Sequence, residues 1–262
     1  SSSTTSENSG YGVSCFGGND GTATAQGFDG TPGYTYSWNT TPIQSTPQAV
    51  GLSAGTFICT VTDTNGCTDL TQAVITEPTE LIISSITSPS LNGFELDCNG
   101  DNDGEVFLTT SGGVAIATYL WSNTETTQDL SGLTAGTYSV TVTDINDCAV
   151  QGSITLNEPA ELIISSITSP EINGFELDCN GDNDGEVFLT TSGGVAIATY
   201  LWSNTETTQD LSGLTAGTYS VTVTDINDCA VQGSITLNEP IVALSSSSTT
   251  SENSGYGVSC FG

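Results

Sequence analysis

The fold of this protein depends on one stretch of sequence, Gly136-Thr-Tyr-Ser-Val-Thr-Val-Thr-Asp144, along which Tyr and Val alternate with Ser and Thr. A period of two is typical of a half-buried β-strand, and β-branched and aromatic side chains fit its pleated surface. The stretch recurs unchanged at residues 217–225, and a diverged copy, Gly55-Thr-Phe-Ile-Cys-Thr-Val-Thr-Asp63, lies nearer the N-terminus. The chain therefore contains three related β-rich units.

The repeats extend well beyond this stretch. Residues 81–159 and 162–240 have the same sequence except at two positions, and Ser1–Gly17 recurs letter for letter as Ser246–Gly262. Self-similarity of this kind indicates a tandem array. We expect repeats at 1–79 (with a truncated first strand), 80–160 and 161–240, and the start of the next repeat at 241–262.

Each repeat reads as short strands separated by turns rich in Gly, Asn and Asp, and no segment has the period of a helix. In the second repeat the expected strands are 81–88, 94–98, 105–110, 117–121, 136–144 and 150–156. Short strands with regular turn signals predict an antiparallel sandwich. The fold class is therefore all-β, with tandem immunoglobulin-like antiparallel β-sandwich domains. Short Asn-Glu-Pro joints between them predict an extended rod.

The charge balance excludes several kinds of function. The chain has 262 residues, 30 of them Asp or Glu and none of them Lys, Arg or His, so its formal net charge is −30. Histidine-dependent nucleophiles, Schiff-base lysines and P-loops are therefore impossible, and we expect no enzyme. Phosphate contacts need cations, which excludes nucleic acid as a partner. No apolar stretch approaches the ~20 residues of a membrane helix, so we expect no direct membrane insertion.

Each complete repeat has one cysteine before its first turn and another after its clearest strand. The predicted disulfides lie within repeats, joining Cys15 to Cys67, Cys98 to Cys148 and Cys179 to Cys229. Such bridges fit an exported, oxidising setting, although pairs of buried free thiols are the alternative. Cys59 occupies a valine position of the repeat, so we expect a buried thiol there, with its redox state left open, and Cys260 has no mate in the chain.

One tryptophan lies in each repeat, two residues after a tyrosine: Trp38, Trp121 and Trp202. Exposed aromatic side chains would indicate glycan binding. A core tryptophan beside a disulfide is common in immunoglobulin-like sandwiches, and we favour that interpretation for all three.

An acidic turn follows the second expected strand of the two later repeats. Alternate oxygen-bearing side chains in a tight loop are what Ca²⁺ requires. The candidate ligands are Asp97, Asn99, Asp101 and Asp103, and in the third repeat Asp178, Asn180, Asp182 and Asp184. The spacing departs from that of an EF-hand, the first repeat lacks the pattern, and Asn-Asp-Gly is also an ordinary turn signal. A plain turn without a cofactor is therefore the favoured interpretation.

Several motifs occur together at fixed spacing. They are Cys-x-Gly-x-x-Asp-Gly from Cys15, Tyr36-Ser-Trp38, Gly55-Thr-Phe57, Asp63-Thr-Asn-Gly-Cys67 and Glu77–Pro78. This pattern resembles the SprB repeat, although the two later copies depart from it at residues 113–118 and their equivalents. The resemblance implies a very large cell-surface adhesin of gliding Bacteroidota, exported by the type IX secretion system. It also implies a filament on the outer membrane that a separate motor moves along the cell.

The leading hypothesis is a repetitive stalk segment of an adhesive filament that mediates attachment during gliding. Its expected partners are a substratum or surface polysaccharide and the neighbouring repeats. Motility and secretion machinery would act through regions outside this chain. The alternatives are an array of carbohydrate-binding modules and a static component of an extracellular matrix or surface layer.

Overall fold

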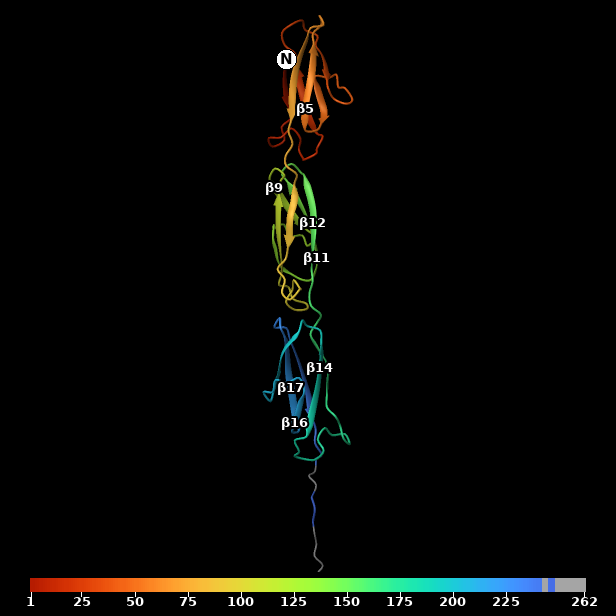
Figure 1. The fold of residues 1–262 in the computed structure, drawn as a ribbon, viewed down its shortest axis with the longest axis vertical. Coiled ribbons are helices and arrows are strands. Elements are labelled where there is room, and N and C mark those ends of the chain that lie inside the picture. The colour runs from red at the N-terminus through yellow and green to blue at the C-terminus, as the bar shows by residue number, and fades with distance from the viewer. Residues whose placement is uncertain (242–244, 248–262) are drawn as a thin grey trace, which may run out of the picture. The chain divides into compact units, whose positions relative to one another are not determined.

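The computed structural model describes residues 1–241 and 245–247, and every regular element within them is a β-strand (Figure 1). The all-β prediction is therefore confirmed. The expected start of the next repeat at 241–262, with Cys260, falls almost entirely outside the described residues. The predicted extended rod concerns how the repeats sit in space, and it stays a prediction.

Six strands form each of the three repeats. The first contains β1 (Ser2–Thr5), β2 (Gly21–Gln26), β3 (Thr35–Trp38), β4 (Gln48–Leu52), β5 (Gly55–Thr62) and β6 (Thr68–Ile75). The second contains β7 (Ile82–Thr87), β8 (Gly104–Ser111), β9 (Ile116–Trp121), β10 (Leu130–Leu133), β11 (Gly136–Asp144) and β12 (Ala149–Leu156). The third contains β13 (Ile163–Thr168), β14 (Gly185–Ser192), β15 (Ile197–Trp202), β16 (Leu211–Leu214), β17 (Gly217–Asp225) and β18 (Ala230–Leu237).

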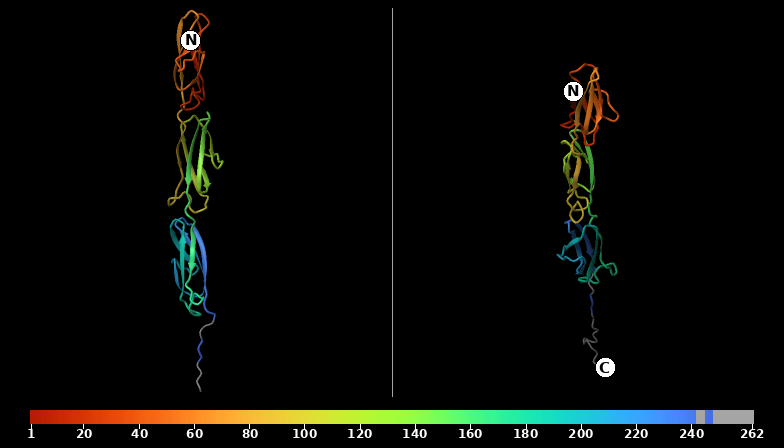
Figure 2. Two further views of the ribbon diagram at one scale, coloured as in Figure 1. Left: turned by 90° about the vertical axis from the view of Figure 1, so that its right-hand side faces the viewer. Right: turned by 45° about the horizontal axis from the view of Figure 1, so that its top comes forward.

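Two three-stranded antiparallel sheets make up each repeat (Figures 1 and 2). Their strand orders are β1-β2-β4 with β3-β5-β6, β7-β8-β10 with β9-β11-β12, and β13-β14-β16 with β15-β17-β18. Each repeat has one cluster of buried apolar residues, and both of its sheets contribute to it. Each repeat is therefore a small sandwich around a core of its own.

The central strand β11 behaves as its alternating sequence predicts. It pairs with β12 from Gly136↔Leu156 to Thr143↔Ala149 and with β9 on its other side. Val140 and Val142 face the core and are buried. Burying one such side chain stabilises the fold by about 1.5–3 kcal/mol relative to leaving it exposed.

The three tryptophans lie in the cores with 1–2% of their surface exposed. A buried indole N–H needs an acceptor, and in each repeat it donates to a main-chain oxygen of the loop that follows. The pairs are Trp38 with Thr46 (3.1 Å), Trp121 with Thr127 (2.9 Å) and Trp202 with Thr208 (2.9 Å).

One predicted strand is wrong and one was missed. Residues 94–98 form a loop, because the main-chain N–H of Leu96 donates to Asn157 O (3.2 Å), which ties this segment to the chain's exit from the repeat. The short strand β10 was missed because Leu130-Ser-Gly-Leu133 contains a glycine and too few residues to show alternation.

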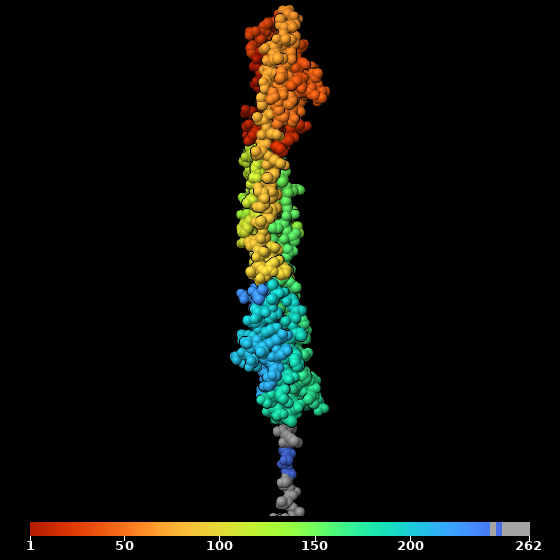
Figure 3. All heavy atoms as spheres, viewed as in Figure 1, coloured from red at the N-terminus to blue at the C-terminus, as the bar shows by residue number. Residues whose placement is uncertain are grey.

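The loop between β3 and β4 projects from the first sandwich, as the orange bulge in Figure 3 shows. Gln44 fixes it to β4 by a pair of bonds to Val50. Its Nε2 donates to the carbonyl of Val50 and its Oε1 accepts from the N–H of Val50, both at 2.9 Å. The side-chain amide of Gln44 thus makes the pair of hydrogen bonds that the main chain of a neighbouring strand would make at this edge.

The chain divides into two compact units that do not follow the repeat boundaries. The first unit contains residues 1–96 and 101–157, and the second contains residues 97–100 and the described residues from 158 onward. The short segment 97–100 thus belongs to the second repeat by sequence but groups with the third.

The burial of a leucine in the first repeat predicts how much its replacement by alanine lowers the free energy of unfolding. Leu52 is 2% exposed and Leu70 is 65% exposed, so the same change can be made at a core site and a surface site of one repeat. We expect Leu52→Ala to lower the free energy of unfolding by about 2–5 kcal/mol and Leu70→Ala to change it by less than about 0.5 kcal/mol. Denaturant titration followed by hydrogen exchange of first-repeat peptides measures both. Equal losses would contradict this core assignment.

Candidate functional site: the joint between repeats

The candidate site is a joint with two halves on different repeats. One half, which we call the loop half, is the segment around the first cysteine: Ser14–Cys15, Asp97–Cys98 or Asp178–Cys179. The other, the turn half, is the turn that precedes the last strand of a repeat: Asp63–Cys67, Asp144–Cys148 or Asp225–Cys229.

The loop half is held at the end of its repeat where the chain leaves. In the first repeat the N–H groups of Gly12 and Val13 donate to Thr76 O, at 2.9 and 3.1 Å. The N–H of Gly17 donates to the carboxylate of Glu77 at 2.7 Å. This last bond gives a role to the glutamate of the Glu-Pro motif, which closes the cysteine loop onto the end of β6.

In the later repeats the loop half makes the corresponding glycine–glutamate bond and also a second bond to the segment by which the chain leaves the repeat, which we call the exit segment. The N–H of Gly100 donates to Glu158 and that of Gly181 to Glu239, both at 2.6 Å. The amides of two candidate calcium ligands also point to this exit segment. Asn99 donates to Pro159 O (3.0 Å) and Asn180 donates to Pro240 O (2.9 Å).

The side-chain amides of Asn99 and Asn180 therefore donate to main-chain oxygens of the protein. Asp97, another candidate ligand, offers its main-chain oxygen to Asn227 (2.9 Å). Within residues 1–241 and 245–247, no group of three or more Asp, Glu or Cys side chains is placed to hold a metal ion. Whether the acidic loops bind Ca²⁺ stays a prediction.

The turn half is organised by a buried carboxylate. Asp144 is 1% exposed; its Oδ1 accepts from the N–H groups of Asn146 (2.9 Å) and Cys148 (3.0 Å), and its Oδ2 from Val114 (3.1 Å). Asp225 makes the same bonds in the third repeat. Side-chain capping of this turn, which the position of the aspartate at the end of its strand predicts, fixes the direction in which the cysteine points.

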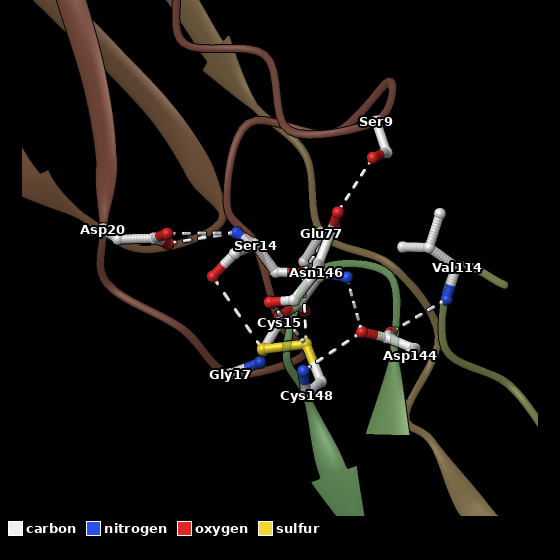
Figure 4. Close-up of a disulfide and its surroundings, with 10 residues drawn as sticks. All are labelled: Ser9, Ser14, Cys15, Gly17, Asp20, Glu77, Val114, Asp144, Asn146 and Cys148. Carbon is white, nitrogen blue, oxygen red and sulfur yellow. Dashed lines mark hydrogen bonds between the residues drawn. A yellow bond between two sulfur atoms is a disulfide. The ribbon is translucent and has the colours of Figure 1, made fainter. Parts of the chain in front are cut away.

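The two halves meet in a disulfide between successive repeats, not within one. Cys15 is bonded to Cys148 and Cys98 to Cys229, each pair with Cα atoms 5.7 Å apart. Figure 4 shows the first of these bonds with Asn146 and Asp144 beside it. The predicted pairings of Cys15 with Cys67, Cys98 with Cys148 and Cys179 with Cys229 are therefore wrong.

The length of a strand explains the correction. In the first repeat Cys67 precedes β6, whereas the loop of Cys15 is bonded to Thr76 and Glu77 just beyond it. Eight residues of strand span about 26 Å at roughly 3.3 Å per residue, but disulfide geometry requires Cα atoms within about 7 Å. The two cysteines of one repeat lie at opposite ends of the sandwich.

An asparagine adds hydrogen bonds across each joint. Asn146 donates to Ser14 O (3.0 Å) and accepts from the hydroxyl of Ser9 (2.8 Å). Asn227 donates to Asp97 O (2.9 Å) in the second joint. This role was not predicted from the sequence, although an asparagine lies two residues before each turn cysteine.

Three of the described cysteines are free. Cys59 is buried on β5 opposite Trp38, and burial raises the pKa of its thiol. Cys67 and Cys179 are exposed free thiols, so neither forms its predicted disulfide. The carboxylate of Asp182 lies close to Cys179 and, with partial desolvation, raises the pKa of that thiol.

Each disulfide closes a long loop. The bonded cysteines are 133 and 131 residues apart. By the chain-entropy relation, a loop of this length stabilises the fold by roughly 5 kcal/mol through its effect on the unfolded chain. That is comparable to the whole stability of many small domains.

A family model matches three segments of the chain. The SprB repeat model covers residues 12–41, 95–126 and 176–207. Each segment runs from the loop half through the core tryptophan. The chain contains three SprB repeats. The match confirms the resemblance drawn from the motifs, and the loop cysteine and the tryptophan of each repeat lie within the matched segments.

Solved structures with similar features share little sequence with this chain. Sidekick-1 immunoglobulin domains 1–4 match with 10% identity over 80% of this chain and 68% of that one, at a TM-score of 0.30. A tetra-tandem repeat from the extending region of a large adhesion protein matches with 17% identity over 90% and 74%, at 0.24. At such TM-scores these likenesses say nothing about function. No curated protein matches the chain.

Disulfides persist in oxidising compartments. Together with the SprB repeats, the two disulfides indicate an extracellular or cell-surface protein and the repeat region of a large adhesin. Among the described residues there is no helix with the length and apolar character needed to cross a membrane.

The connectivity can be read from peptides. Because trypsin has no site in the chain, we suggest digestion at acidic residues under non-reducing conditions, followed by mass spectrometry. The peptide of Cys15 is expected to be linked to one carrying Cys-Ala-Val, the sequence that begins at Cys148, and Cys148→Ser should release it. A link between Cys15 and the peptide Thr-Asn-Gly-Cys67 would overturn the assignment.

The turn aspartate of the first repeat predicts a pH dependence. The N–H groups of Thr31 and Cys67 donate to Asp63 and hold the pKa of its carboxyl below the ordinary value. A lowered pKa in the folded state gives stability that is present above the unfolded pKa of about 3.9. This stability is lost as the pH falls through the folded pKa.

We therefore expect Asp63→Asn to destabilise the first repeat at neutral pH, and the difference from the unaltered chain to shrink on acidification below about pH 4. Asp29→Asn is the control, because Asp29 is exposed and its backbone, at φ 64°, suits asparagine. Denaturant unfolding across this pH range measures both. A difference that stays constant with pH would count against the role of the carboxylate.

Proposed function

We propose that this chain is a stalk segment of a very large filamentous adhesin on the cell surface, and that the filament mediates attachment during gliding. In this proposal the protein is exported by the type IX secretion system and associated with the outer membrane through regions outside the chain. The single observation that carries the proposal is the disulfide joint between successive SprB repeats.

A stalk under tension needs successive repeats to be joined by more than one covalent connection. Between the first and second repeats there are two covalent routes, the main chain and the bond from Cys15 to Cys148. A single cut in the connecting segment would leave the repeats attached. Within the second repeat, Cys98 and Cys148 are both anchored, so only the roughly 50 residues between them can be drawn out by force.

The charge of the chain suits an exposed fibre. With a formal net charge of −30 and no basic side chain, neighbouring filaments repel one another at close range, and trypsin-like proteases find no site. Screening limits this repulsion to about 8 Å at physiological salt. The repeats of one filament can therefore still contact each other through the joints.

The partner in this proposal is a substratum or surface polysaccharide. Many weakly binding repeats along one filament give strong overall attachment. The chain has several repeats, but its described residues expose at most two aromatic side chains in any one repeat; these are Phe16, Phe28, Phe107 and Phe188. This distribution favours a stalk over an array of dedicated carbohydrate-binding modules.

Imaging on living cells tests the proposal. Gliding cells that express the protein would be labelled with a fluorescent antibody fragment against the first repeat, whose sequence is distinct. We expect the label to move along the cell surface, and an excess of the fragment to reduce attachment to glass. A label that stays still on gliding cells would instead support a static matrix or surface-layer component. Retention of defined glycans by the purified chain would support the carbohydrate-binding alternative.

A further inference from the structure

Two exposed thiols remain after the joints are assigned. Cys67 lies in the turn half of the first repeat and Cys179 in the loop half of the third. In both observed joints, the loop half of one repeat bonds to the turn half of the next. By that rule each of these cysteines is half of a joint, and the missing half belongs to a repeat beyond the three described.

The open turn half has the same internal bonds as a closed one. Asp63 Oδ1 accepts from the N–H groups of Asn65 (2.9 Å) and Cys67 (2.8 Å). The corresponding bonds of Asp144 in the closed joint are 2.9 and 3.0 Å. The turn therefore forms without its partner. Beside it a hollow lined by Phe28, Tyr34 and Cys67 opens to solvent.

The open loop half is likewise complete. Asn180 donates to Pro240 O at 2.9 Å, and Gly181 N–H donates to Glu239 at 2.6 Å. In the closed joint the bond from Asn99 is 3.0 Å and that from Gly100 is 2.6 Å. Both open halves are thus already arranged as they are in closed joints.

The sequence identifies the missing partner. Residues 246–262, which follow the third repeat, are identical to residues 1–17. This identity indicates a further copy of the first repeat starting there, whose turn half would carry a copy of Cys67.

We propose that Cys179 forms a disulfide with the Cys67 of a second copy of this unit, placed directly after the third repeat. The joint between units would then have the same construction as the joints within a unit. Disulfides would link every repeat to the next along the whole array. This inference concerns how the array is joined and does not depend on attachment or gliding.

The bond forms by thiol–disulfide exchange with a small-molecule disulfide as the oxidant. The thiolate of one cysteine attacks that disulfide, forms a mixed disulfide and releases one small thiol. The thiolate of the other cysteine then attacks the protein sulfur and releases the second small thiol. Two protein thiols are oxidised to one disulfide, and one small disulfide is reduced to two thiols.

The test uses the full chain lengthened by residues 18–79 after Gly262, which completes a fourth repeat as a copy of the first. The original Cys67 is changed to Ser, so that the added copy carries the only turn of that sequence with a thiol. The protein is oxidised with oxidised and reduced glutathione, digested at acidic residues and mapped by mass spectrometry. The link from Cys15 to Cys148 serves as the check that the chain has folded.

We expect the added Cys67 peptide to be linked to a peptide that carries Cys-Asn-Gly, the sequence that begins at both Cys98 and Cys179. The matched variant Cys179→Ser should lose this link and gain a free thiol on the added Cys67. Both substituted cysteines are exposed, so neither change disturbs a core. The proposal is overturned if the added cysteine bonds to Cys260 within its own repeat, stays free, or keeps its link in the Cys179→Ser variant.

Discussion

The length of the last strand of each repeat is the constraint on which the rest of the structure depends. Because β6 and its equivalents β12 and β18 are eight residues long, the two cysteines that flank them lie about 26 Å apart. No bond within a repeat can close that distance. Each cysteine is instead presented at an end of its sandwich, where the next repeat brings a partner within reach.

The joints also show how a chain without basic side chains accommodates buried carboxylates. Asp144 and Asp225 are each 1% exposed, and a buried ion without a partner is strongly destabilising. No lysine, arginine or histidine is present to pair with them. Main-chain N–H groups take that role, three for each carboxylate, and charge-assisted bonds of this kind are stronger than neutral ones. The same bonds set the direction of the neighbouring cysteine.

Small cores and long disulfide loops complement each other in this protein. Each repeat buries only nine or ten apolar residues in its cluster, and domains of this size are marginally stable on their own. A bond between repeats restricts the unfolded chain of two repeats at once, because the loops it closes exceed 130 residues. Stability and continuity between repeats thus come from the same bond, which suits the stalk proposed above.

The sequence by itself determined the all-β class, the period of the repeats and the family, because strand alternation and repeated motifs are local properties. It also determined that no basic side chain would be present to pair with a carboxylate. Only the tertiary structure decided the connectivity of the cysteines. Spacings of 50 to 52 residues say nothing about which end of a sandwich each cysteine occupies. That depends on the direction and length of β6 and on the bond from Gly17 to Glu77, which fixes the loop of Cys15 at the far end.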